Sequence, residues 1–414
     1  MISSTVSLSV SHAPLPDART MAQAAQNATA PHVVIVAGEA SGDNHAAQLV
    51  EALKRQQPGL CYSGMGGEAM RRAGVDLLVD ASDLAVVGIW EVLVHYRQIR
   101  RALKQLVAHL RATRPQLLIL VDYVEFNLRL AEQAKRLGIT VLFYVSPQIW
   151  AWRAGRIQRI KRCVDAMAVL FPFEEAVYQR HAIPVRYVGN PLLDQVHPRY
   201  SREQARVHFG LDTDAPLVGL LPGSRRGELR RHLPLLMATC QYLRIRHPEL
   251  QFILPVAPGV NQARDLYPYL DSACGVTVIQ GETYDAMHAC DALVVASGTA
   301  TLEAGLLGVP MAIIYRISPL SYAILKRLVK IRDIGLVNIV CEKRVVQEFI
   351  QQAATPVQVG TEVERLLHDP AYAQEMRTAL SALRQRLGSS GHSAHVAAMA
   401  LELIKYGTLR TSLP

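Results

Sequence analysis

Small polar residues and one carboxylate follow a buried stretch in the C-terminal half of the chain. Residues 292–296 are uncharged and apolar, which predicts a buried strand, and Ser297, Gly298 and Thr299 form a tight turn before a helix. Such a turn exposes backbone N–H groups where a phosphate can approach without meeting a Cβ. Glu303 lies one helical turn further on, close enough to accept hydrogen bonds from the hydroxyl pair of a sugar. The alternative is an ordinary capped turn between a strand and a helix.

Two carboxylates follow another apolar run, residues 117–121. Asp122 comes directly after this predicted strand, and Glu125 and Asn127 follow within five residues. The carboxyl ends of strands in open α/β sheets face the ligand crevice, so both carboxylates are placed for acid–base chemistry. The same Asp-x-x-Glu spacing is also that of a capping box, in which one carboxylate would only close the helix.

Two guanidinium groups stand at the end of a third apolar run, residues 217–221. The turn Pro-Gly223-Ser224-Arg225-Arg226 places them beside a predicted helix N-terminus, an arrangement suited to a diphosphate. It is not a Walker loop, which needs Gly-x-x-x-x-Gly-Lys-Ser/Thr.

Two further glycine-bearing turns, residues 38–43 and 64–67, lack the Gly-x-Gly-x-x-Gly pattern of dinucleotide-binding folds. Nicotinamide binding is therefore poorly supported, and we interpret the second of these turns as close strand-to-helix packing.

Regular alternation of strands and helices positions all these residues. The predicted strands are residues 33–37, 117–121, 140–145, 166–170, 185–188, 217–221, 252–256, 276–279, 292–296 and 311–315. The pattern pauses after Asp194 and restarts at Leu217, which sets a domain boundary. A chain of 414 residues, half of them apolar, has ample core for two domains.

We therefore predict an α/β protein with two Rossmann-like, doubly wound domains facing across a cleft and C-terminal helices packing back. The expected divisions are a disordered leader (1–30), an N-terminal domain (31–196), a C-terminal domain (213–385) and a C-terminal helical segment (386–414).

Composition restricts the class of protein further. A net charge of +9 and a pI near 9.3 indicate an anionic partner. The six cysteines are scattered, with no Cys-x-x-Cys pair, which predicts free thiols in a reducing compartment and neither a metal site nor a disulfide framework. The first thirty residues lack the pattern of a secretory signal, and Met21 is an alternative start of translation.

Basic residues are concentrated in the N-terminal half. Residues 97–162 hold fourteen Lys or Arg and only three Asp or Glu. Residues 84–95 are almost entirely apolar, and an apolar helical stripe follows, opposed by Arg97, Arg100, Arg101, Lys104 and Arg111. These charges are either a solvated helix face or a surface for anionic lipid. The longest uncharged run, residues 137–152, is too short for a membrane-spanning helix.

Five motifs occur in one order along the chain. They are residues 38–43 (Gly-Glu-Ala-Ser-Gly-Asp), 146–152 (Ser-Pro-Gln-Ile-Trp-Ala-Trp), 221–225 (Leu-Pro-Gly-Ser-Arg), 297–303 (Ser-Gly-Thr-Ala-Thr-Leu-Glu) and 326–330 (Lys-Arg-Leu-Val-Lys). This set closely resembles the lipid-A-disaccharide synthases, which are glycosyltransferases of the GT-B type. The match runs from about residue 33 to the C-terminal helices.

The resemblance implies the condensation of UDP-2,3-diacylglucosamine with 2,3-diacylglucosamine 1-phosphate to a β-1,6 disaccharide and UDP, without a metal or cofactor. It implies that residues 31–196 form the acceptor and membrane-facing domain and residues 213–385 the UDP-sugar-binding domain. It also implies a cytoplasmic protein, peripheral on the inner face of the inner membrane and in contact with its anionic lipid surface. No nucleic acid partner is expected, and a homodimer is possible. Implied substrate-binding residues are Glu39, Ser41, Asn127, Gln148, Trp150, Gly223, Ser224, Ser297, Gly298, Thr299, Glu303 and Asn338.

An inverting transfer needs a base and a group that holds the departing diphosphate. Asp122 or Glu125 is the expected base, and Arg225 the expected diphosphate ligand. The family's Asp-Ala-Pro-Asp-Phe-Asn stretch appears here as residues 122–127, Asp-Tyr-Val-Glu-Phe-Asn, so the choice of base stays open. Two other readings are a sugar-nucleotide epimerase of the same fold and a non-catalytic peripheral membrane protein.

Overall fold

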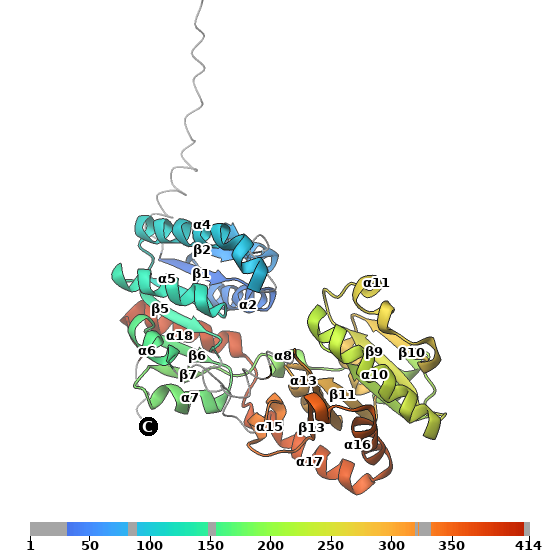
Figure 1. Cartoon of the computed structure of the whole chain (residues 1–414). Coiled ribbons are helices and arrows are strands. Elements are labelled where there is room, and N and C mark those ends of the chain that lie inside the picture. The colour runs from blue at the N-terminus through green and yellow to red at the C-terminus, as the bar shows by residue number, and fades with distance from the viewer. Residues whose placement is uncertain (1–30, 82–88, 148–154, 319–321, 323–332, 410–414) are drawn as a thin grey trace, which may run out of the picture. The chain divides into compact units, whose positions relative to one another are not determined.

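Two parallel sheets, each with helices around it, form the body of the protein (Figure 1). The computed structural model describes residues 31–81, 89–147, 155–318, 322 and 333–409. The first sheet has the strand order β3-β2-β1-β4-β5-β6-β7, and the second has the order β10-β9-β8-β11-β12-β13. The predicted α/β class with two doubly wound sheets is confirmed, whereas the predicted domain limits stay a prediction.

The strands of the first sheet are β1 (His32–Ala37), β2 (Cys61–Gly66), β3 (Asp76–Asp80), β4 (Leu117–Val121), β5 (Thr140–Tyr144), β6 (Ala166–Val169) and β7 (Val185–Tyr187). The helices of this half of the chain are α2 (Ala40–Gln56), α3 (Glu68–Arg72), α4 (Ile89–Thr113), α5 (Val124–Arg136), α6 (Arg156–Cys163), α7 (Pro172–Gln179), α8 (Leu192–Gln195) and α9 (Arg202–His208).

The strands of the second sheet are β8 (Leu217–Leu221), β9 (Gln251–Val256), β10 (Val276–Gln280), β11 (Ala292–Ala296), β12 (Met311–Tyr315) and β13 (Glu348–Ile350). The helices that follow α9 are α10 (Arg226–Arg246), α11 (Gln262–Asp265), α12 (Thr283–His288), α13 (Ala300–Leu306), α15 (Leu336–Cys341), α16 (Pro356–His368), α17 (Pro370–Arg386) and α18 (His392–Tyr406). Within the described residues, none of the helices is both long and apolar enough to cross a membrane.

The central strands are buried along their whole length, which explains why their sequences are apolar without alternation. β4, β8 and β11 expose no residue, and their neighbours are parallel, with Ile35 opposite Ile119 and Val294 opposite Leu220. Strands covered on both faces need apolar side chains on both faces. Each fully buried Val, Ile or Leu contributes about 1.5–3 kcal/mol to folding. All ten predicted strands occur in the structure.

Sequence reasoning missed β2, β3 and β13, and the predicted turn at residues 64–67 is wrong. Gly64 and Gly66 belong to β2, and only Gly67 lies in the turn before α3. A Cβ at Gly64 would overlap the carbonyl oxygen of Ile35, and the register with β3 shifts between Gly64 and Met65. Glycine serves close strand-to-strand approach here, so the strand carries little of the usual propensity signal.

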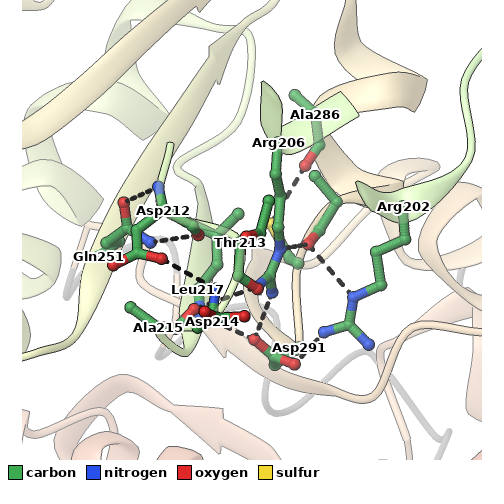
Figure 2. A network of polar contacts seen from close by, with 12 residues as sticks. Arg202, Arg206, Asp212, Thr213, Asp214, Ala215, Leu217, Gln251, Ala286 and Asp291 are labelled. Atoms are coloured by element: carbon green, nitrogen blue, oxygen red, sulfur yellow. Dashed lines mark hydrogen bonds and ion pairs between the residues drawn. The ribbon is translucent and has the colours of Figure 1, made fainter. Parts of the chain in front are cut away.

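A buried arginine ties the segment before β8 to the amino ends of two strands (Figure 2). The Arg206 guanidinium donates to the carbonyl oxygens of Thr213 (2.8 Å), Ala215 (3.0 Å) and Ala289 (3.0 Å), and to Asp291 Oδ2 (2.6 Å). The same Asp291 oxygen accepts the N–H of Leu217 at 2.7 Å. All three nitrogens of this buried guanidinium donate to a partner, so the start of β8 and the start of β11 are held together.

Arg206→Met should lower the free energy of unfolding by about 3–5 kcal/mol, because it removes the buried cationic partner of Asp291 and the guanidinium donor of the Thr213 and Ala215 carbonyl groups. Urea unfolding followed by circular dichroism measures the change. Arg202→Met is the matched control, since Arg202 also pairs with Asp291 but keeps 39% of its side chain exposed; it should cost about 1 kcal/mol or less. Equal losses in the two variants would show that the buried Arg206 does not hold the starts of β8 and β11 together.

Candidate active site

Asp122 sits on a strained turn between β4 and α5. Asp122 and Tyr123 both adopt left-handed backbone conformations, with φ of 49° and 40°. A left-handed conformation costs a residue with a side chain roughly 1–2 kcal/mol. Tyr123 is the N-cap of α5, which puts Asp122 before the cap and Glu125 at the second helical position. The capping-box alternative needs Asp122 at the N-cap and is therefore wrong.

Asn127 forms hydrogen bonds that hold this strained turn in place. Its side chain is fully buried, and Nδ2 donates to the carbonyl oxygens of Val121 (3.2 Å) and Asp122 (2.7 Å). Both bonds go to the backbone that carries Asp122. This geometry makes Asn127 a positioning residue for the turn, and the substrate contact that the resemblance implied stays a prediction.

The stretch from Gly38 to Asp43 divides into a structural part and an accessible part. The Asp43 carboxylate is buried and accepts the N–H groups of Gly67 (2.7 Å), Ala69 (2.9 Å) and Met70 (3.2 Å), so it caps α3. α2 begins at Ala40, earlier than the glycine turn suggested.

Glu39 and Ser41, at the start of α2, are exposed and free to meet a ligand. A Cβ at Gly38 would overlap the Tyr123 ring, so this glycine lets the strained turn after β4 lie against the turn after β1. Burial and the nearby Glu39 raise the pKa of the Tyr123 phenol.

The loop after β8 presents Arg225. Its side chain is 74% exposed, and among the described residues its guanidinium pairs with the carboxylate of Glu228, at 3.3 Å. The N–H groups of Ser224 and Arg225 donate to the other oxygen of Glu228, at 3.1 and 3.2 Å. An anion can therefore use these two N–H groups only after displacing Glu228, which differs from the open turn that the sequence suggested.

The neighbouring Arg226 is the less suitable diphosphate ligand. It pairs with Asp265 at 3.2 Å, and Asp265 also pairs with Arg264 at 2.7 Å.

The loop after β11 is open at its small residues. No described atom would lie within 4 Å of a Cβ at Gly298. α13 begins at Ala300, and its N-cap Thr299 makes no side-chain cap. The Ser297 hydroxyl is used within the protein, because it donates to the carbonyl of Ile334 at 3.0 Å.

Glu303 lies partly buried on α13, with its carboxylate 3.4 Å from the Tyr284 hydroxyl. Burial raises the pKa of this carboxyl group, and the hydrogen bond from Tyr284 opposes the shift. A partly buried carboxylate that accepts one long hydrogen bond can still accept others from the hydroxyl groups of a sugar.

Asn338 is a structural residue in this geometry, although the resemblance implied a substrate contact. It is 1% exposed, its Nδ2 donates to the Val346 carbonyl and to Glu348 (both 2.8 Å), and its Oδ1 accepts two N–H groups, from Val345 and Val346 (both 2.9 Å). All four hydrogen-bonding positions of the amide are therefore used within the protein.

Gln148 and Trp150, and the motif at residues 326–330, lie outside the described residues.

The sequence profile of the lipid-A-disaccharide synthetases matches residues 33–400. The lipid-A-disaccharide synthase of Geobacter sulfurreducens is 48% identical over 377 residues, which cover 91% of this chain and 98% of that protein. The enzyme of Nitrosococcus oceani is 46% identical over 362 residues, covering 87% of this chain and 93% of its own. The chain belongs to the lipid-A-disaccharide synthase family. The predicted resemblance is confirmed, and the protein is a glycosyltransferase of lipid A biosynthesis.

Solved structures outside the family share its fold. A UDP-GlcNAc 2-epimerase from Neisseria meningitidis bound to UDP-GlcNAc superimposes with a TM-score of 0.57 at 13% identity, over 86% of this chain and 97% of that chain. The calicheamicin glycosyltransferase CalG4 gives a TM-score of 0.57 at 15% identity, over 91% and 99%. An epimerase and a glycosyltransferase fit equally well, so the fold alone does not separate these activities.

Arg225→Ala should lower turnover roughly a hundredfold or more if Arg225 holds the leaving diphosphate, as removal of one preorganised stabilising group usually does. Arg225→Lys should restore little, because an ammonium cannot replace a bidentate fork. Steady-state kinetics test this, with Arg226→Ala as the control in the same turn. Near-normal turnover of the Arg225 variant and a large loss in the control would reverse the assignment.

Proposed function

We propose that this protein condenses UDP-2,3-diacylglucosamine with 2,3-diacylglucosamine 1-phosphate, with inversion, to give the β-1,6 lipid A disaccharide and UDP. The observation that carries the proposal is membership of the family over residues 33–400, which supports a UDP-sugar donor and a sugar-phosphate acceptor. The residues are consistent with it, since a carboxylate follows β4 and an accessible guanidinium follows β8.

In this mechanism the base takes the proton of the acceptor's 6-hydroxyl as its oxygen attacks the anomeric carbon of the donor. The bond between that carbon and the diphosphate oxygen breaks, and UDP leaves with the electron pair. Arg225 balances the charge that develops on the diphosphate. Glu303 accepts hydrogen bonds from hydroxyl groups of the donor, and Gly298 and Thr299 leave room for it beside the strand end.

Asp122 is the better candidate for the base. Its turn is held in a left-handed conformation by the buried amide of Asn127. Strained backbone that the surrounding structure fixes occurs preferentially at functional sites. Glu125 is exposed on the first turn of α5, where a longer side chain is less well oriented.

Asp122→Asn should lower turnover about 10²–10⁴-fold, because the amide keeps the size of the side chain but accepts no proton. The KM for the donor should change little, since Asp122 acts on the acceptor. Glu125→Gln is the matched control and should stay within a few-fold of the wild type. A large loss in Glu125→Gln with a mild Asp122→Asn would identify Glu125 as the base.

The basic face of α4 supports the proposed contact with anionic lipid. Ala102, Leu106 and Leu110 are buried and anchor the helix. The positively charged side chains of its other face are exposed; they are Arg97, Arg100, Arg101 and Lys104. The apolar residues 84–88 that precede this helix lie outside the described residues. Contact with the inner face of the inner membrane would bring the protein to both acylated substrates.

Reversing Arg97, Arg100, Arg101 and Lys104 to Glu should abolish binding to anionic vesicles at low salt, because each basic residue near such a surface contributes about 1 kcal/mol. Wild type should dissociate as the salt concentration rises. Co-sedimentation measures both effects. The control variant reverses the same number of exposed charges on or directly after other helices, at Arg55, Arg129, Arg180 and Arg384. Unchanged co-sedimentation of the α4 variant would show that these charges form only a solvated helix face and do not bind lipid.

A further inference from the structure

A buried histidine connects two loops of the second sheet. His232 lies on α10 and is fully buried. Its Nδ1 is 2.8 Å from the carbonyl oxygen of Pro222, and its Nε2 is 3.0 Å from the backbone nitrogen of Arg316. Pro222 follows β8 and Arg316 follows β12, so one imidazole ring contacts the carboxyl ends of two different strands.

The two contacts fix the protonation state of the ring. A carbonyl oxygen can only accept, so Nδ1 carries the proton, and a backbone N–H can only donate, so Nε2 is unprotonated. Burial lowers the pKa of His232 below its ordinary value. Of the groups around it, Glu228 and the Pro222 carbonyl act in the opposite direction, whereas Arg316 and Arg231 lower the pKa further. The ring is therefore neutral at pH 7.

The connected loops flank the loop that carries Gly298. In the strand order, β8 and β12 are the two neighbours of β11, and residues 297–299 follow β11. The Pro222 loop continues directly into Gly223, Ser224 and Arg225. The ring therefore sets the spacing of the loops on both sides of the proposed diphosphate position.

We propose that His232 is a positioning residue for the diphosphate of the donor: its neutral ring holds the loop of Arg225 at a fixed distance from the loop of Arg316. The inference rests on the proposed function, because it presumes a UDP-linked donor at these loops. Simple core packing is the competing explanation, and an apolar ring of similar size would serve that purpose equally well.

Protonation gives the proposal a second consequence. In a charged imidazolium, Nε2 carries a proton and can no longer accept the backbone N–H of Arg316. The hydrogen bond between His232 Nε2 and Arg316 is therefore lost in acid. Because burial lowers the pKa of His232, donor binding should be insensitive to this group at neutral pH and should weaken only in acid, below the ordinary range of a histidine.

The test compares UDP affinity, measured by calorimetry, in three variants. His232→Phe keeps the volume and removes both hydrogen bonds, and we expect UDP to bind roughly tenfold more weakly or worse, because buried groups lose their partners. His232→Gln can donate with its amide nitrogen and accept with its oxygen, and it should stay within about threefold of the wild type. Leu236→Ala, one turn along the same buried face, should destabilise the fold but leave UDP affinity unchanged.

Two further readouts separate positioning from packing. Hydrogen exchange of the Arg316 amide should accelerate in His232→Phe and stay slow in Leu236→Ala. As the pH is lowered into the acid range in which both proteins stay folded, the wild type should lose UDP affinity relative to His232→Gln, which has no titratable group at position 232; this comparison stands even if His232→Phe does not fold.

Wild-type UDP affinity in His232→Phe, or identical pH profiles of the wild type and His232→Gln, would overturn the inference. Failure of the wild type itself to bind UDP would instead contradict the proposed function.

Discussion

Buried polar side chains hold segments at the ends of strands in both sheets, and the candidate site depends on them. Asn127 binds the backbone after β4, His232 binds the backbone after β8 and β12, and Asn338 binds that of the segment before β13. Parallel sheets covered on both faces offer a ligand only the ends of their strands. A loop at such an end needs partners for its backbone groups, and a buried amide or imidazole supplies them in a fixed direction.

This arrangement divides the sequence motifs into two kinds of residue. Some members of each motif turn inward and fix the loop, as Asp43 does for α3 and Ser297 does for Ile334. Others stay accessible and can meet a ligand, as Glu39 and Arg225 do. Glu228 shows a third possibility, because it occupies backbone N–H groups that an anion could also use.

The buried strands were predictable because their burial requires apolar residues at consecutive positions. The strand ends, and hence Asp122, Arg225 and Glu303, followed from them. β2 was missed because its glycines serve contact with β1, which is a long-range property. The positioning roles of Asn127 and Asn338 were likewise hidden, since a polar residue inside a motif has the same sequence signature whether it faces the ligand or the backbone.

Glycosyl transfer has to be distinguished from epimerisation, because the protein shares its fold with an epimerase that binds UDP-GlcNAc. Incubation of the purified protein with UDP-2,3-diacylglucosamine, first alone and then with 2,3-diacylglucosamine 1-phosphate, distinguishes the two activities. The account predicts UDP release only when the acceptor is present, in equal amount to a β-1,6-linked disaccharide. UDP release or isomerisation of the donor without acceptor would contradict it.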